Sequence, residues 1–157
     1  DPVVLDYFRI LYVKIFGNPL SESAKNRRKV FKNIDVVRKV FRKFPAFSDW
    51  DNRVFEDYLK YCFKKNKSGV ELNCSPVVEC KIFNCSDFRT LSHFANIQTE
   101  THLIYPKKYE VCPPWTAKKI AKGNPKSTVT KLENATHFFP FEMPEWTLNK
   151  VKELVHI

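Results

Sequence analysis

The sequence predicts an α/β protein in which a long helical region precedes a short piece of parallel sheet. Apolar residues recur at helical spacing as far as about residue 95. Two apolar, β-branched segments follow, and a helical segment separates them, which is typical of parallel strands joined by a helix. We therefore divide the chain into the end of a core strand with its turn (1–4), a helical region (5–95) and a β-α-β-α region (96–157).

The helical region is predicted from amphipathic segments and their end signals. Asp51 is a good N-cap for one helix, and Pro45 ends another because the residue before a proline avoids helical backbone angles. These patterns predict helices at 5–16, 35–44, 52–64 and 77–85, with a short strand at 70–72.

The last region should contain strands at 101–105 and 127–132, a helix from 113 to 120 and a closing helix over 145–155. Two parallel strands cannot bury both faces of a sheet, and a right-handed βαβ unit needs further strands beside it. We therefore expect sheet partners N-terminal to Asp1, which would make the chain one piece of a larger domain.

Composition narrows the class of protein. The chain has 157 residues, of which 43% are hydrophobic, so it can form about one globular domain. It contains neither an apolar run long enough to cross a membrane nor a secretory signal pattern. The five cysteines are an odd number without a Cys-x-x-Cys pair, which argues against zinc and favours reduced thiols. We expect an intracellular protein, cytoplasmic or organellar (peroxisome or mitochondrion), and not a secreted one.

The chain carries 27 basic and 17 acidic residues, a net charge of +10. These charges are spread along the sequence rather than gathered in one block, which favours a solvated basic surface over a nucleic-acid interface. An anionic membrane surface remains an alternative partner.

Three glycines are few for a complete α/β enzyme, which uses glycine at tight turns and at close approaches to ligands. The sequence contains no Gly-x-Ser-x-Gly, no Gly-x-Gly-x-x-Gly and no phosphate loop. We therefore expect any nucleophile or cofactor cradle to lie outside this chain, and we expect no cofactor.

Several groups of residues, in order and spacing, resemble the C-terminal half of the α/β-hydrolase family with its helical cap. The resemblance is to the lipase, esterase and epoxide-hydrolase type, and in particular to fungal peroxisomal lipase-like members. It extends over nearly the whole chain, and its most specific block is 135–144. The matching segments are Asp1-Pro2-Val3, 27–31, the aromatic residues Phe44, Phe47, Trp50 and Tyr58, then 69–76, 79–83, 101–105, Cys112-Pro113-Pro114 and 134–144.

The resemblance implies that His137 is the catalytic histidine, in the loop after the last strand. Without it, His137 would be read as a structural histidine among phenylalanines. The family's acid usually follows the preceding strand, but Tyr109 occupies that position here. Glu110, one residue further on, and Asp1, after an earlier strand, are the two candidates for the acid, and a degenerate triad with neither is a third reading.

The resemblance thus predicts the C-terminal segment of a serine hydrolase that cleaves an ester or similar apolar acyl substrate. The nucleophile would be on the N-terminal half of the hydrolase fold or on a partner chain. One alternative is a catalytically inactive, hydrolase-like accessory subunit of a larger assembly. Another is a basic module that binds nucleic acid or a membrane.

Overall fold

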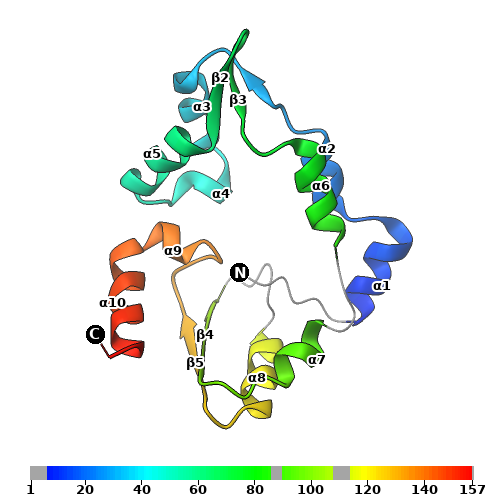
Figure 1. Ribbon diagram of the computed structural model, residues 1–157, viewed down its shortest axis with the longest axis vertical. Coiled ribbons are helices and arrows are strands. Elements are labelled where there is room, and N and C mark those ends of the chain that lie inside the picture. The colour runs from blue at the N-terminus through cyan, green and yellow to red at the C-terminus, as the bar shows by residue number, and fades with distance from the viewer. Residues whose placement is uncertain (1–6, 86–89, 108–113, 157) are drawn as a thin grey trace. The chain divides into compact units, whose positions relative to one another are not determined.

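The computed structural model describes residues 7–85, 90–107 and 114–156 (Figure 1). They form two compact units. The first, which we call the parallel-sheet unit, draws on Asp1–Ile15, Ser86–Pro140 and Glu145–Ile157. The second, the antiparallel-sheet unit, comprises Phe16–Cys85 and Phe141–Pro144.

The parallel-sheet unit is built on β4 (Thr101–Pro106) and β5 (Ser127–Leu132), which pair in parallel from Thr101 opposite Ser127 to Pro106 opposite Leu132. Helix α8 (Pro114–Gly123) connects them and contacts both strands as well as α7 (Thr90–Ala95). Its buried face consists of Thr116, Ala117 and Ile120. The two predicted strands and the helix between them are therefore confirmed.

Asn124, which is buried, joins the end of α8 to the starts of both strands. Its side-chain Nδ2 donates to the carbonyl of Thr99, ahead of β4, at 2.7 Å. Its Oδ1 accepts the backbone N–H of Lys126, ahead of β5, at 3.0 Å. The amide thus supplies, by side-chain hydrogen bonding, the turn that a glycine-rich loop often makes.

Two further helices belong wholly or mainly to this unit. Helix α1 (Tyr7–Phe16) and helix α10 (Pro144–Leu154) lie within three residues of the predicted bounds at each end. Both carry exposed apolar side chains, among them Phe8, Ile15, Leu148 and Val151. The predicted strand end at 1–4 lies outside the described residues.

The antiparallel-sheet unit contains a three-stranded sheet in the order β1-β3-β2, all antiparallel. The strands are β1 (Val30–Phe31), β2 (Phe63–Asn66) and β3 (Gly69–Leu72). The helices of the unit are α2 (Pro19–Lys25), α3 (Ile34–Phe41), α4 (Pro45–Ser48), α5 (Asn52–Tyr61) and α6 (Pro76–Asn84). Side-chain oxygens of Asn18, Asn33 and Asp51 cap α2, α3 and α5.

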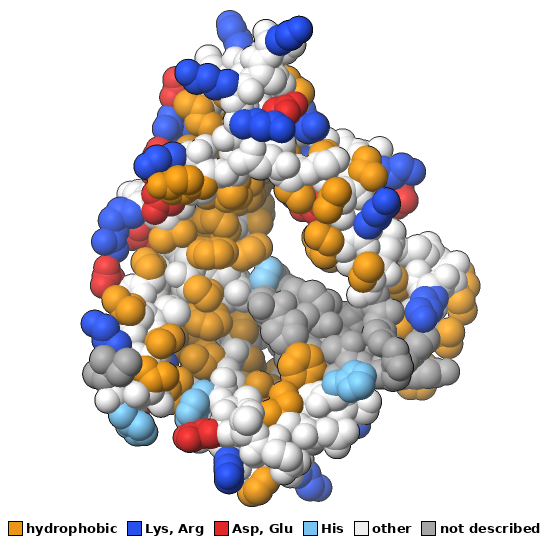
Figure 2. Space-filling model, in the orientation of Figure 1, with side chains coloured by type: hydrophobic (Ala, Val, Ile, Leu, Met, Phe, Trp, Pro, Cys, Tyr) orange, Lys and Arg blue, Asp and Glu red, His pale blue; other side chains and the backbone are white. Residues whose placement is uncertain are grey.

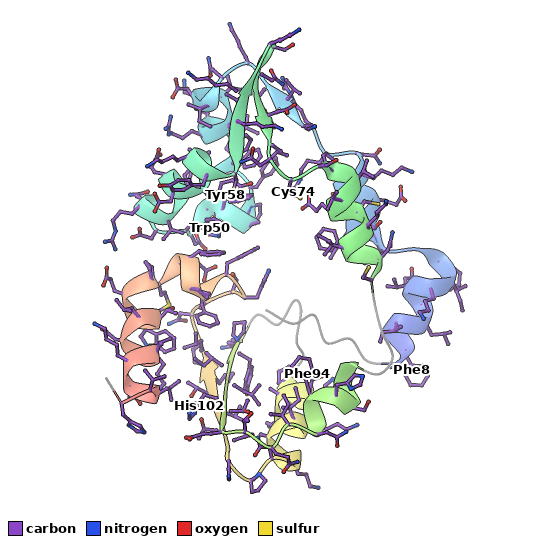
Figure 3. The ribbon with its side chains drawn as sticks, viewed as in Figure 1. Phe8, Trp50, Tyr58, Cys74, Phe94 and His102 are labelled. Carbon is purple, nitrogen blue, oxygen red and sulfur yellow. The ribbon has the colours of Figure 1, made fainter. Side chains whose placement is uncertain are left out.

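Aromatic rings form the core of this unit. The ring of Phe41 lies 5.7 Å from that of Phe31, 5.8 Å from that of Phe63 and 5.2 Å from that of Phe47. Tyr58 contacts Phe47, Phe63 and Trp50, the last at 5.6 Å (Figure 3). Edge-to-face and tilted pairs of this kind add to the hydrophobic effect of burying large rings.

Two of the helices predicted in the region 5–95 extend too far. The helix predicted over 52–64 ends at Tyr61, and residues 63–66 form β2 instead. Burying Phe63 in the aromatic core and pairing with β3 outweigh the helical pattern of the preceding turn. The helix predicted over 35–44 ends at Phe41, and Pro45 begins the separate short helix α4.

Within the described ranges, none of the helices combines the length and the apolar character needed to cross a membrane.

Gly69 is required by a close approach of two strands. Its φ is +133°, and a Cβ added there would overlap the backbone carbonyl oxygens of Phe31 and Lys32. Gly17 has a φ of +83° but nothing within 4 Å of such a Cβ.

We expect Gly69→Ala to lower the free energy of unfolding by about 3 kcal/mol, from strain and overlap together. Gly17→Ala, with strain alone, should cost about 1 kcal/mol. Urea unfolding of both variants measures these free energies of unfolding. Equal losses in the two variants would contradict the close approach at Gly69.

Burial raises the pKa of Tyr58 to about 12. Between about pH 10, where an ordinary tyrosine ionises, and pH 12 the unfolded chain loses this proton while the folded chain keeps it. The free energy of unfolding should therefore fall as pH rises through this window. Tyr58→Phe should reduce that fall, whereas Tyr61→Phe, on an exposed ring, should not. Urea unfolding at several pH values measures the difference; indistinguishable slopes for the two variants would refute it.

Candidate active site

The carboxyl ends of β4 and β5 bring two loops to one edge of the sheet. The backbone N–H of Lys107 donates to the carbonyl of Leu132 at 2.7 Å, so the strands stay together to their last residues (Figure 1). The chain leaves this edge after Lys107 on one strand and after Leu132 on the other. In parallel sheets this edge is where ligands bind.

An ion-pair cluster occupies the start of the second loop. Glu133 accepts from Lys131 at 2.6 Å and lies 3.2 Å from the Lys107 ammonium, so it links the two strand ends. The hydrogen bond from Lys131, and then that from Lys107, lower the pKa of Glu133. Glu133 is thus an ionised carboxylate bound to two lysines.

His137 follows in the same loop, in a turn that Thr136 organises. The Thr136 hydroxyl accepts the N–H of Phe138 at 3.1 Å, and the Thr136 carbonyl accepts the N–H of Phe139 at 3.1 Å. These bonds begin the short helix α9 (Phe139–Glu142), and the buried side chain of Ala135 precedes them. A threonine at this position therefore fixes the backbone on which the imidazole is carried.

The His137 imidazole is half-buried and lies against the ring of Phe138 in a tilted arrangement, with ring centroids 3.9 Å apart. A half-buried imidazole keeps access to a reacting group while its neighbours restrict its orientation. An imidazole has one ring nitrogen that can accept a proton and one that can donate it, so such a group can both take and give a proton.

The two predicted acids, Glu110 and Asp1, lie outside the described residues, as does Tyr109. The pairing of either carboxylate with His137 therefore stays a prediction. The topology brings the start of the loop that carries Glu110 to the same edge as the His137 loop, since β4 ends at Pro106 and β5 at Leu132.

The other histidines have different surroundings. His93 is exposed in α7, and His156 is exposed after α10. His102 lies near the amino end of β4, where its Nδ1 is 2.6 Å from the Thr128 hydroxyl (Figure 3). Among the residues that the structure describes, no group of three or more His, Cys, Asp or Glu side chains could hold a metal ion.

Sequence reasoning proposed His137 through the resemblance, but it did not identify the side-chain contacts in the same loop. The hydroxyl of Thr136 and the Lys131–Glu133–Lys107 cluster were not singled out. A Thr two residues before a run of aromatic residues is a turn signal that could have indicated the first. The second depends on the register of the two strands, which the sequence does not reveal.

No protein-family model and no curated protein sequence matches the chain. Solved structures do. An E-2-(acetamidomethylene)succinate hydrolase superposes with a TM-score of 0.76 over 99% of this chain at 12% identity. The peroxisomal α/β-hydrolase Lpx1 from Saccharomyces cerevisiae gives 0.67 over 87% at 14% identity. The thioesterase domain from the curacin biosynthetic pathway gives 0.63 over 96% at 12% identity.

The chain spans 56% of the first of these structures, 37% of the second and 52% of the third. It therefore has the fold of an α/β-hydrolase and corresponds to a C-terminal portion of it, as the sequence predicted. At these identities the likeness concerns the fold, and the chemistry has to be argued from the residues.

We expect Thr136→Val to lower the free energy of unfolding by about 1 kcal/mol, because the N–H of Phe138 loses its acceptor while the side-chain volume is kept. Thr136→Ser keeps the hydroxyl and should lower the free energy of unfolding by a smaller amount. Chemical denaturation of the two variants measures the difference. Equal losses would show that the hydroxyl does not hold the turn.

Proposed function

We propose that this chain supplies the cap and the catalytic histidine of a serine α/β-hydrolase whose nucleophile lies outside it. The observation that carries the proposal is the position of His137. It follows the second of two parallel strands, at the edge where ligands bind in such sheets, in a turn held by side-chain hydrogen bonds. The solved structures with this fold include a hydrolase and a thioesterase, which supports acyl chemistry.

In the proposed reaction, His137 is the general base and then the general acid. A neutral imidazole takes the proton of the serine hydroxyl as this oxygen attacks the acyl carbon, and it then protonates the leaving group. In the second half of the reaction His137 takes a proton from water, which attacks the acyl-enzyme, and it returns this proton to the serine oxygen as the bond from that oxygen to the acyl carbon breaks. Glu110 or Asp1 would accept a hydrogen bond from the other ring nitrogen and hold the tautomer. No cofactor takes part.

Exposed apolar surface supports a partner that completes the sheet. Parallel sheets normally bury both faces, yet Val129 of β5 is 39% exposed and Leu103 and Ile104 of β4 are half-buried. Helix α10 has no fully buried residue in the described structure. We propose that the N-terminal half of the hydrolase fold, or a partner chain with the nucleophile, covers these surfaces.

An apolar acyl group is the proposed substrate. Most aromatic side chains of the antiparallel-sheet unit pack on one another, but Phe44 and Phe141 remain 49% and 41% exposed. Rings of this kind, with a few polar groups, line sites for apolar ligands.

A second candidate, an inactive accessory subunit, rests on Tyr109 in the expected position of the acid. Binding of nucleic acid is less well supported. The hairpin of β2 and β3 carries basic side chains (Figure 2), but Lys64 and Lys29 pair with Glu71, and Arg27 pairs with Glu79.

A fluorophosphonate probe distinguishes an active serine hydrolase from an inactive accessory subunit. In the complete protein we expect it to label a serine outside residues 1–157. His137→Ala should slow labelling and ester hydrolysis by about 10³-fold or more, because the serine loses its base. His93→Ala, an exposed histidine of α7, should leave both unchanged. Absence of a labelled serine would support the accessory role. Labelling that is undiminished in His137→Ala would show that His137 is not the base.

A further inference from the structure

A carboxylate, an imidazole and a hydroxyl contact one another at the amino end of the parallel sheet, the end away from the His137 loop. They belong to Glu100, His102 and Thr128, all within the parallel-sheet unit. His102 of β4 is paired with Thr128 of β5, so the register of the two strands puts both side chains on one face of the sheet. Glu100 lies two residues before His102, just ahead of β4. The proposed function uses none of these three residues.

The His102 ring is held between the other two groups. Its Nδ1 is 2.6 Å from the hydroxyl oxygen of Thr128, a short hydrogen-bond distance. Its Nε2 is 3.4 Å from a carboxylate oxygen of Glu100. The imidazole side chain is only 22% exposed, whereas the Thr128 residue is exposed (Figure 3). A reagent in solution therefore has access to the hydroxyl while its neighbours restrict the ring.

The carboxylate favours one tautomer of the ring. An ionised carboxylate only accepts hydrogen bonds, so Glu100 favours the neutral imidazole that carries its hydrogen on Nε2. Nδ1 is then the unprotonated nitrogen, and the Thr128 hydroxyl donates to it. This is the arrangement that a general base needs, because the nitrogen that can take a proton faces the hydroxyl that can lose one.

We propose that Thr128 is an acyl acceptor, activated by His102 and Glu100, that takes an acyl group from an aryl ester. The Thr128 oxygen attacks the carbonyl carbon of the ester while Nδ1 of His102 takes the hydroxyl proton. A bond forms between Oγ1 and the acyl carbon, and the bond from that carbon to the aryl oxygen breaks. The aryl oxide leaves with the electron pair of the broken bond, and the proton on His102 passes to solvent. The product is an O-acyl threonine in β5.

The test treats the complete protein with p-nitrophenyl acetate and identifies acetylated residues by peptide mass spectrometry. Thr99, an exposed threonine of the same unit, is the internal control. The two ring nitrogens of His102 face Glu100 and Thr128, so Thr99 does not share this base. We expect Thr128 to be acetylated about 100-fold faster than Thr99, because general base catalysis contributes about 10²- to 10⁴-fold.

His102→Asn distinguishes a base from a structural partner. The asparagine amide can keep a hydrogen bond to Thr128, but it cannot take the proton, so acetylation of Thr128 should fall about 100-fold while the melting temperature is kept. Glu100 is 69% exposed, so Glu100→Gln keeps the fold. It removes the charge that favours the reactive tautomer, and it should lower acetylation about tenfold. His93→Asn, at an exposed histidine of α7, should leave acetylation unchanged.

Acetylation of Thr128 no faster than that of Thr99 would overturn the proposal. An unchanged rate in His102→Asn and Glu100→Gln would also overturn it, and the contact would then be a structural hydrogen bond between strands. The result is independent of the proposed function. His137→Ala should leave acetylation of Thr128 unchanged even where it abolishes ester turnover, because His137 follows the carboxyl end of β5. Loss of acetylation in His137→Ala would show that His102 is not the activating base.

Discussion

Because β4 and β5 pair in parallel and in register, the loops that follow them leave the sheet at a single edge. The other features of the candidate site depend on this pairing. The Lys107–Glu133–Lys131 cluster forms across the two strand ends, and the turn that carries His137 begins just beyond it. Antiparallel pairing would put the loop after one strand at the opposite edge from the loop after the other.

Side chains make turns and helix ends that glycine could otherwise make, and this explains how a chain with three glycines folds. Asn18, Asn33 and Asp51 cap helices, Asn124 closes the turn between α8 and β5, and Thr136 forms the turn before α9. Each substitutes a side-chain hydrogen bond for backbone freedom. Gly69 is retained where a side chain would overlap β1.

Much of the fold could be predicted from local patterns, and the rest depends on contacts distant in sequence. The strand at 127–132 and the helix near 145–155 follow from their alternation and helical periodicity, and the structure has them within a residue. Strand β2 was missed because Lys64, Lys65 and Lys67 are polar residues that fit a loop as well as a solvated strand. The pairing with β3 and the burial of Phe63 decide that this segment is a strand.

Local sequence patterns likewise indicate some residues of interest outside the regular elements and miss contacts between segments distant in sequence. The role of His137 is predicted from the resemblance that the residues around it carry, and it stays a prediction. The contact of Phe141 with Trp50 and Asp51 could not be predicted, because nothing local to residue 141 indicates a partner near residue 50. Alternation and periodicity report which face of an element is buried, and they do not report against which distant segment it packs.

The central claim is that the imidazole of His137 serves a serine supplied by polypeptide beyond this chain. An experimental structure of the complete protein, phosphonylated at its reactive serine, tests this most directly. We expect further parallel strands beside β4 and β5, and a ring nitrogen of His137 within about 3 Å of an oxygen of the modified serine. A two-stranded sheet with no added strand, or a modified serine far from His137, would contradict the account.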